Sequence, residues 1–336
     1  MKKPYNIDVA VLLIFHARPG CFAQVFEQVK KARPSKLFLY QDGAREGNEK
    51  DVIGIKKCRE IALDIDWECE VHTKFQDKNF GCDPSGYIAQ RWAFDNVEKC
   101  IVLEDDVVPT QSFFPFCKEL LDKYENDERI HMICGMNNLE TTDSPYSYLY
   151  AQTGSIWGWA SWKRAVDTWQ PNYDILDNEY DLQKVKDHLK LYKCDVKRRV
   201  NVWKISRESG VQHHETLNGT SMFCNSRLNI IPTKNMIINV GNTPEGGTHS
   251  TNGNETIPRG LRKIYTMKSF DIEFPLSHPK YVIEDVAFQK KLFRVMGYGH
   301  PFVKFWRRIE KTFLIIRHEG LGKLFRKLKM RRIKKI

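Results

Sequence analysis

Three consecutive carboxylates, Glu104-Asp105-Asp106, directly follow the apolar run Ile101-Val102-Leu103. Carboxylates this close repel one another, and a divalent cation bound by hard oxygen ligands would offset that repulsion. Mg²⁺ or Mn²⁺ held by one or two protein carboxylates takes its other ligands from water and substrate phosphates. The triplet therefore predicts a metal site that receives a diphosphate-bearing substrate. The alternative is a solvated acidic turn that closes a strand.

The segments around the triplet alternate apolar runs with helical patterns. Val9–Phe15 is a continuous apolar run, typical of a strand buried on both faces of a parallel sheet. Further helices and strands are expected, in chain order, at 19–33, 36–40, 50–63, 68–75, 84–97 and 100–103. This order predicts an α/β fold with an open, mostly parallel twisted sheet flanked by helices. Ligands bind such sheets at the carboxyl ends of the strands, where the triplet lies.

The second half of the sequence is less regular. Its expected features are a helix over 113–124, a short strand over 131–134, a Trp-rich stretch over 156–169 and polar, loop-rich sequence through Asn254. We expect a single catalytic body, residues 1–301. Its predicted parts are a nucleotide-binding half over 1–135 and an acceptor and metal-binding half over 136–301.

The net charge of +11 has a single origin. Residues 302–336 hold thirteen Lys and Arg against two Glu, so the rest of the chain is neutral. Apolar residues in this segment recur at three- and four-residue spacing, which predicts a basic amphipathic helical tail. Such a tail favours an anionic membrane surface, at about 1 kcal/mol per Lys or Arg. Nucleic acid could attract the same basic charge, but its phosphates would make no use of the apolar stripe. A helix packed on the body is the remaining alternative.

The number and spacing of the cysteines indicate whether the protein works in a reducing or an oxidising compartment. There are nine, an odd number, with no C-x-x-C pair, which is typical of free thiols in a reducing environment, where we expect them to be small buried hydrophobic residues. The N-terminal apolar run follows Asp8 and lacks a small-residue cleavage site, so we interpret it as a buried strand. No stretch approaches the roughly 20 apolar residues that span a bilayer. We therefore expect a cytoplasmic protein, peripheral on the inner face of a bacterial cell membrane.

Five segments, in order, resemble a known family. They are Leu12–Pro19, Tyr40–Arg45, Asp77–Cys82, Val102–Val107 and Ile156–Trp162. They resemble blocks of the bacterial nucleotide-sugar glycosyltransferases of the GT-A fold, found with polysaccharide and lipopolysaccharide synthesis, whose nucleotide half is similar to N-acetylglucosaminyltransferase I. The resemblance covers about residues 8 to 250. It implies a GT-A-type sheet, a UDP-sugar donor, a glycan or lipid-linked acceptor, and inversion at the anomeric carbon.

The resemblance also implies residue roles. Asp106 would bind Mn²⁺ or Mg²⁺ directly, while Glu104 and Asp105 face the ribose and the water shell of the metal. Asp42 would accept a hydrogen bond from the uracil N3–H. His249 lies in a segment similar to the family's Asn-Ile-Gly and Thr-His stretch and would complete the metal site. A solvent-exposed loop histidine and a turn-stabilising aspartate are the plainer alternatives.

Other residues were selected for their type and position. Arg18 follows the first strand, where a guanidinium offers paired donors to a base or a phosphate, although a surface arginine would look the same. Asn79 and Gly81 precede the third helix, where the backbone can approach a diphosphate. Trp157 can stack on a sugar ring. We expect Trp162 and Trp169 to be core residues instead.

Transfer needs a base for the acceptor hydroxyl. Counting back from Leu228–Pro232, which resembles the family's closing strand, Glu215 falls where relatives carry an Asp thought to act as the base. His214 is the second candidate, and a polar loop of satisfied side chains is the alternative. Two other functions stay open: a sugar-1-phosphate nucleotidyltransferase, although 16–19 lacks a Gly-rich basic loop, and a degenerate, non-catalytic membrane scaffold.

Overall fold

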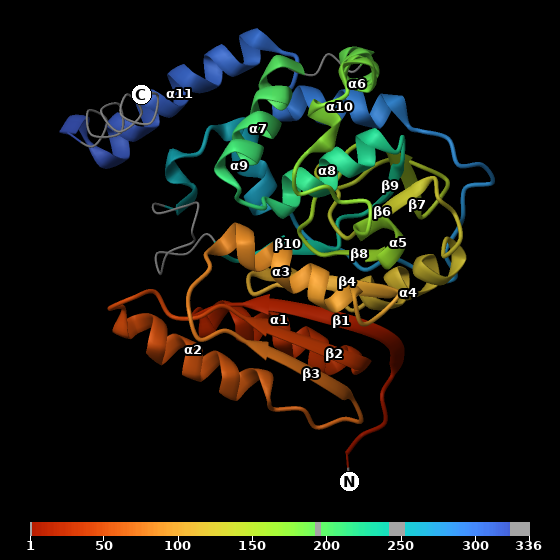
Figure 1. Ribbon diagram of the computed structural model, residues 1–336, viewed down its shortest axis with the longest axis vertical. Coiled ribbons are helices and arrows are strands. Elements are labelled where there is room, and N and C mark those ends of the chain that lie inside the picture. Colours follow the sequence, from red (N-terminus) through yellow and green to blue (C-terminus); the bar gives the residue numbers. More distant parts are fainter. Residues whose placement is uncertain (1, 192–195, 242–252, 323–336) are drawn as a thin grey trace.

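The predicted alternation of strands and helices forms the first half of the molecule. The computed structural model describes residues 2–191, 196–241 and 253–322 (Figure 1). Its first elements are β1 (Ile7–Phe15), α1 (Pro19–Ala32), β2 (Pro34–Gln41), α2 (Glu49–Ala62), β3 (Glu70–Phe75), α3 (Cys82–Phe94) and β4 (Lys99–Glu104). Pro19 begins α1, and Pro34 follows its end because proline lacks the N–H that a helix interior needs.

The second half contains more helix than its sequence indicates. Its elements are β5 (Val107–Pro109), α4 (Phe113–Lys123), β6 (Ile130–Cys134), β7 (Tyr148–Ala151), β8 (Trp159–Trp162), α5 (Lys163–Val166), α6 (Glu179–Leu191), α7 (Val196–Ser209), α8 (His214–Cys224), β9 (Leu228–Pro232), β10 (Ile237–Asn239), α9 (Arg259–Thr266), α10 (Val286–Met296) and α11 (Pro301–Glu319).

The expectation of loop-rich sequence through Asn254 is wrong, because α6, α7 and α8 occupy much of it. Helices α6 and α7 bury only three and two side chains, so their apolar stripes are sparse, whereas four of the seven residues that α8 buries are polar. In α7 the buried residues are Trp203 and Ser206 alone. A polar helix with a narrow apolar stripe is hard to distinguish from a loop by periodicity.

The main sheet places the end of β4 near its centre. The strand order is β3-β2-β1-β4-β8-β6-β9-β7. The first four strands are mutually parallel, β8 runs antiparallel between β4 and β6, and β7 is an antiparallel edge strand. A two-stranded sheet pairs β5 with β10. The predicted α/β class, with an open and mostly parallel sheet flanked by helices, is confirmed.

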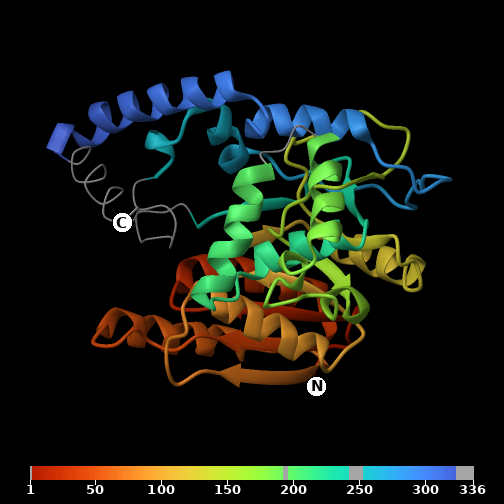
Figure 2. The ribbon, with the colours of Figure 1, turned by 45° about the horizontal axis from the view of Figure 1, so that its top comes forward.

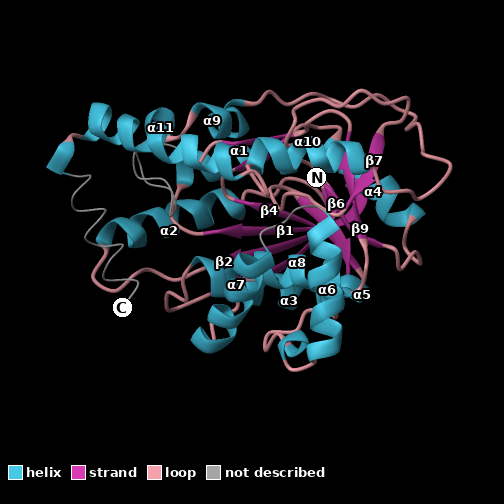
Figure 3. Ribbon diagram, turned by 90° about the horizontal axis from the view of Figure 1, so that it is seen from above, coloured by secondary structure: helices cyan, strands magenta, loops and turns pink. Residues whose placement is uncertain are grey.

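Two apolar cores cover the two faces of the sheet (Figure 3). Alternate residues of β1 enter different cores: Val11 and Leu13 pack with α1, α2 and α4, while Leu12 packs with α3 and α5 to α8. This explains the continuous apolar run of β1, because both of its faces are covered. Trp162 and Trp169 are buried, which confirms their predicted core role.

Helix α11 packs on the body by one face only (Figure 2). Ile315 is buried, the Glu310 carboxylate accepts a hydrogen bond from the Arg259 backbone N–H, and Arg307 donates to the Val295 carbonyl. The opposite face is exposed and apolar; it consists of Phe302, Phe305, Trp306, Ile309, Phe313 and Ile316. We call these six residues the outer face of α11. The division of the chain after residue 301 stays a prediction.

Two further sequence expectations concern cysteines and membrane spans. The described cysteines are all free thiols, and five of them, Cys21, Cys58, Cys100, Cys117 and Cys134, are buried. Cys82 and Cys224 are exposed, so they do not fit the expectation of buried thiols. In the described ranges, the helices are too short or too polar to cross a bilayer.

Trp162 tests the core that supports β4. Its ring is buried, and its indole N–H donates to the Leu121 carbonyl (3.0 Å). Trp162→Ala is expected to lower the free energy of unfolding by about 3–5 kcal/mol, because a large cavity would form. Trp306→Ala, which removes the same side chain from the outer face of α11, should change it by less than about 1 kcal/mol. Urea denaturation measures both, and equal losses would contradict this packing.

Candidate functional site

The carboxyl ends of three neighbouring strands meet at one edge of the sheet. In the parallel register, Ile14 of β1 lies beside Glu104 of β4, and Phe15 lies beside Gln41 of β2. The segments that leave these strands are therefore adjacent. Sequence-predicted site residues come from all three: Arg18 after β1, Asp42 after β2, and the acidic triplet at β4.

Arg18 neutralises much of the triplet. Its guanidinium forms an ion pair with Asp105, which is 5% exposed, and a second with Asp106 (3.0 Å between Nη2 and Oδ2). Burial disfavours the charged guanidinium, yet the two carboxylates raise the pKa of Arg18 overall. A side chain of the protein thus supplies part of the positive charge that the triplet requires, and the metal that the sequence predicts stays a prediction.

Asp106 is held by the small sheet of β5 and β10. Pairing of Val107 with Asn239 brings the Asn239 amide to Oδ1 of Asp106 (3.2 Å), and the Val240 backbone N–H donates to the Asp106 carbonyl (2.8 Å). A Cβ atom on Gly241 would lie 2.0 Å from Asp106 Oδ2, so glycine is required there. Sequence reasoning gave Asn239 no role of its own.

Among the residues that the structure describes, Glu104 has no such cationic partner. Burial raises its pKa to about 8, and the charges of Asp106, Asp105 and Glu215 add to the effect. Its nearest ring nitrogen, His214 Nε2, is 4.0 Å from Oε1. A carboxyl that keeps its proton at neutral pH lacks a counter-charge.

The residues present fit a divalent cation. Glu104 and Asp106 offer hard oxygen donors, and the pKa of Glu104 is raised by burial and, in addition, by neighbouring negative charges that Arg18 offsets only in part. Within the three described ranges, no group of three or more His, Cys, Asp or Glu side chains forms a metal cage. The predicted ligand His249 lies outside those ranges. A cation here would take further ligands from substrate and water.

Asp42 organises the loop before α3. One carboxylate oxygen accepts hydrogen bonds from the backbone N–H groups of Gly43 (3.0 Å) and Phe80 (2.9 Å), and the other accepts from Asn79 Nδ2 (2.9 Å) and the Gly81 N–H (3.0 Å). Gly81 has a φ of 87°, which favours glycine. The structure therefore joins three predicted nucleotide residues in one loop. Contact of Asp42 with a base stays a prediction.

The two candidate bases begin α8 but differ in access. His214 is 5% exposed; burial lowers its pKa, and a Cβ atom on Gly86 of α3 would lie 2.4 Å from its Nδ1. Glu215 is exposed and lines a cavity. The two side chains therefore lie on different sides of the α8 terminus, with His214 against Glu104 and Glu215 open to ligands.

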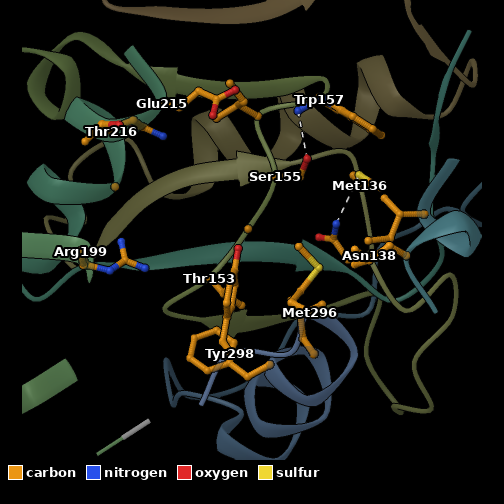
Figure 4. Close-up of a pocket in the computed structure, with 18 of the residues that line it drawn as sticks. Met136, Asn138, Thr153, Ser155, Trp157, Arg199, Glu215, Thr216, Met296 and Tyr298 are labelled. Atoms are coloured by element: carbon orange, nitrogen blue, oxygen red, sulfur yellow. Dashed lines mark hydrogen bonds between the residues drawn. The ribbon is translucent and has the colours of Figure 1, made fainter. Parts of the chain in front are cut away.

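The cavity beside Glu215 has a volume of about 840 Å³. Figure 4 shows Glu215 and Trp157 toward one end and Tyr298 and Met296 toward the other. Trp157 packs at a tilt against Tyr265, with ring centroids 5.5 Å apart. Arg18, Asp42, Asn79 and the acidic triplet do not line this cavity. Trp157 is thus separated from the other predicted donor residues and belongs to the cavity wall.

Sequence reasoning missed the charged wall of this cavity. Four basic side chains line it: Arg198 and Arg199 of α7 and Lys304 and Lys311 of α11. For Arg198 and Arg199 the sequence shows only basic charge in a polar segment, which is the ordinary pattern of a solvated surface. Lys304 and Lys311 belong to the predicted basic amphipathic tail, where nothing in the sequence links them to this cavity. The cavity forms only when residues about 100 positions apart come together.

The comparisons with known proteins give a limited likeness. No model of a protein family and no curated protein matches the chain. Mouse xyloside xylosyltransferase 1 is similar in structure at 10% identity, with 65% of this chain and 81% of that chain covered and a TM-score of 0.33.

Two further structures give lower TM-scores. A 4-diphosphocytidyl-2C-methyl-D-erythritol synthase from Anaerococcus prevotii is similar at 10% identity, with 51% of this chain and 78% of that chain covered and a TM-score of 0.29. A UDP-glucose pyrophosphorylase in complex with UDP-glucose is similar at 13% identity, with 43% of this chain and 62% of that chain covered and a TM-score of 0.25. Likeness at this level carries no functional conclusion.

Arg18→Met tests the ion pairs at the strand edge. It would leave Asp105 buried without its cation, so the free energy of unfolding should fall by about 3–5 kcal/mol at pH 7. The loss should shrink at acid pH, where the unpaired carboxylates take up protons. Arg129→Met, at an exposed ion pair with Asp127, should cost less than about 1 kcal/mol. Urea denaturation at both pH values measures the effect; a pH-independent loss would contradict this electrostatic role.

Proposed function

We propose that the chain is a metal-dependent glycosyltransferase of GT-A type. It moves a sugar from a nucleotide diphosphate sugar, a UDP-sugar, to a hydroxyl of a glycan or lipid-linked acceptor. The observation that carries the proposal is the junction of two sites at Glu104 and Glu215. One site is the acidic edge at the carboxyl ends of the strands, which suits a donor diphosphate. The other is the large cavity, which suits an acceptor, and the two meet at these residues.

The donor would bind along the strand-end edge. The loop that Asp42 organises ends at Gly81, directly before the N-terminus of α3, a helix of 13 residues. Backbone N–H groups at such a terminus favour phosphate oxygens. Asp105 fixes Arg18, so the guanidinium can approach a phosphate without reorganising.

Asp106 and Glu104 would hold Mn²⁺ or Mg²⁺, with His249 as a proposed third ligand. When bound, the cation supplies charge neutralisation of the leaving diphosphate. Asn239 and Arg18 orient the Asp106 carboxylate through separate oxygens. Glu104 would release its proton as the cation binds, because burial first and the neighbouring negative charges second raise its pKa, and a cation would offset both effects.

Glu215 is the better placed base. It faces the cavity, whereas His214 is buried behind it. Glu215 would accept the proton of the acceptor hydroxyl as that oxygen attacks the anomeric carbon and the nucleoside diphosphate leaves. A single displacement of this kind inverts the anomeric centre. His214 acts as a positioning residue between α3 and Glu104.

The segment between β1 and α1 favours glycosyl transfer over nucleotidyl transfer. It contains only His16, Ala17 and Arg18. It therefore offers no glycine-rich cradle for the phosphates of a nucleoside triphosphate. The cavity, by contrast, is large enough for an acceptor of several rings.

Asp106→Asn tests the chemistry with a nearly isosteric change. A screen of UDP- and GDP-sugars with Mn²⁺ identifies the donor, and the variant should lose on the order of a hundredfold or more of its turnover. Asp177→Asn, at an exposed ion pair with Arg207, is the control and should retain full turnover. Undiminished activity in the Asp106 variant, or turnover of nucleoside triphosphate with sugar 1-phosphate, would contradict the proposal.

The outer face of α11 supports a peripheral membrane location. Phe302 is 81% and Trp306 is 66% exposed, and cations flank this face at Arg308 and Arg317. Exposed aromatic and aliphatic side chains with basic neighbours are suited to an anionic lipid interface. We propose that this face rests on the membrane that holds the acceptor.

Flotation with vesicles of phosphatidylglycerol and phosphatidylethanolamine tests this location. The full chain should float, and the double variant Phe305→Ser/Trp306→Ser should remain at the bottom of the gradient, because its apolar insertion is lost. Tyr281→Ser, which removes another exposed aromatic ring outside α11, is the control. Equal flotation of the wild type and the double variant would contradict the membrane location.

A further inference from the structure

The cavity beside Glu215 is strongly cationic. Of the residues that the structure describes, Arg198, Arg199, Lys304 and Lys311 line it, and Glu215 is the only acidic residue in its wall. Among the described residues, neither Arg199 nor Lys311 forms an ion pair. A wall in which Arg199 and Lys311 face the cavity without an anionic partner in the described part of the chain is unsuited to a neutral sugar alone, because such charges favour an anionic ligand.

Arg199 is fixed in place. Its Cζ atom lies 4.8 Å from the centroid of the Phe223 ring, which α8 holds in the cavity wall. Figure 4 shows its guanidinium directed into the cavity. A guanidinium pre-oriented in this way loses little freedom when it binds phosphate through paired donors.

The rest of the wall is apolar and adaptable. Met132, Met222, Leu292 and Phe293 are almost fully buried, and Met296 lies beside them. Methionine side chains accommodate ligands of irregular shape. An apolar wall next to a cationic wall matches an amphiphile, in which a chain of methylene groups adjoins a charged group.

Helix α11 connects this cavity to the outside. Lys304 and Lys311 face the cavity from one side of the helix, while the outer face presents its aromatic rings on the opposite side. A ligand held by these lysines would therefore lie directly beneath the surface proposed to contact lipid.

We propose that the cavity binds the acceptor as an anionic amphiphile. A phosphate lies between Arg199 of α7 and Lys311 of α11, the adjoining apolar chain lies against the methionine wall, and the reacting hydroxyl lies near Glu215. The role of Glu215 rests on the proposed function, whereas binding of the amphiphile does not depend on it.

Isothermal titration of the full chain tests the ligand class with three probes: octyl phosphate, octyl glucoside and glucose 6-phosphate. Octyl phosphate should bind at least tenfold more tightly than either of the others, because it alone combines the charge with the chain. Equal affinity for octyl glucoside would overturn the anionic requirement. Equal affinity for glucose 6-phosphate would overturn the requirement for an apolar chain.

Matched variants test the location. The double variant Arg199→Met/Lys311→Met should weaken octyl phosphate binding at least tenfold, whereas Arg199→Lys/Lys311→Arg retains most of it. Lys290→Met removes an exposed lysine of α10 that does not line the cavity, and it should leave binding unchanged. Unchanged affinity in the Met double variant would overturn the proposal, as would equal weakening by Lys290→Met.

Saturation with UDP and Mn²⁺ separates this inference from the proposed function. Octyl phosphate should bind with the same affinity to the saturated protein, because the donor edge and the cavity have different lining residues. Competition would overturn the assignment of the cavity to the acceptor. Octyl phosphate binding without any UDP binding would defeat the proposed donor site and still support the amphiphile site.

Discussion

Concentrated negative charge at the end of β4 is the constraint on which the rest of the site depends. Asp105 is buried, and it is tolerated because Arg18 reaches it from the end of β1. The parallel pairing of β1 with β4 makes that contact possible, and the pairing of β5 with β10 brings Asn239 to Asp106. The backbone arrangement therefore places each compensating group beside its carboxylate.

Arg18 and Asn239 do not compensate all of the negative charge at the end of β4. The strand edge therefore stays acidic, while the cavity beside it is basic, so the molecule has two neighbouring regions of opposite charge. Glu104 keeps its proton to a pH of about 8, so the strand edge can accept a further cation. The neighbouring cavity carries an excess of positive charge from α7 and α11. A donor with its metal and an acceptor with its phosphate would each meet the opposite charge, and neither would compete for the other's position.

Local sequence patterns predicted the first half of the fold well. The apolar run Val9–Phe15 and the prolines at 19 and 34 mark real element boundaries, because burial on both faces and a missing N–H act locally. Helices α6 and α7 escaped prediction because few of their side chains are buried, and α8 escaped it because four of its seven buried residues are polar. The pairing of Arg18 with Asp105 also escaped prediction, since 87 residues separate them and no local signal links the two.

The candidate site was likewise predicted only where a local sequence pattern marks its residues. Asp42 and the triplet were selected because they follow strands, and the structure does place them at neighbouring strand ends. The basic cavity wall was not predicted, because Arg199 and Lys311 resemble solvated residues until α7 and α11 face the same space.

The central claim is that the strand edge binds a nucleoside diphosphate through a divalent cation. Titration of the full chain with UDP, in the presence of Mn²⁺ and again in the presence of EDTA, tests it most directly. We expect UDP to bind at least tenfold more tightly in the presence of Mn²⁺ than in the presence of EDTA. Equal affinity under the two conditions, or no binding under either, would contradict it.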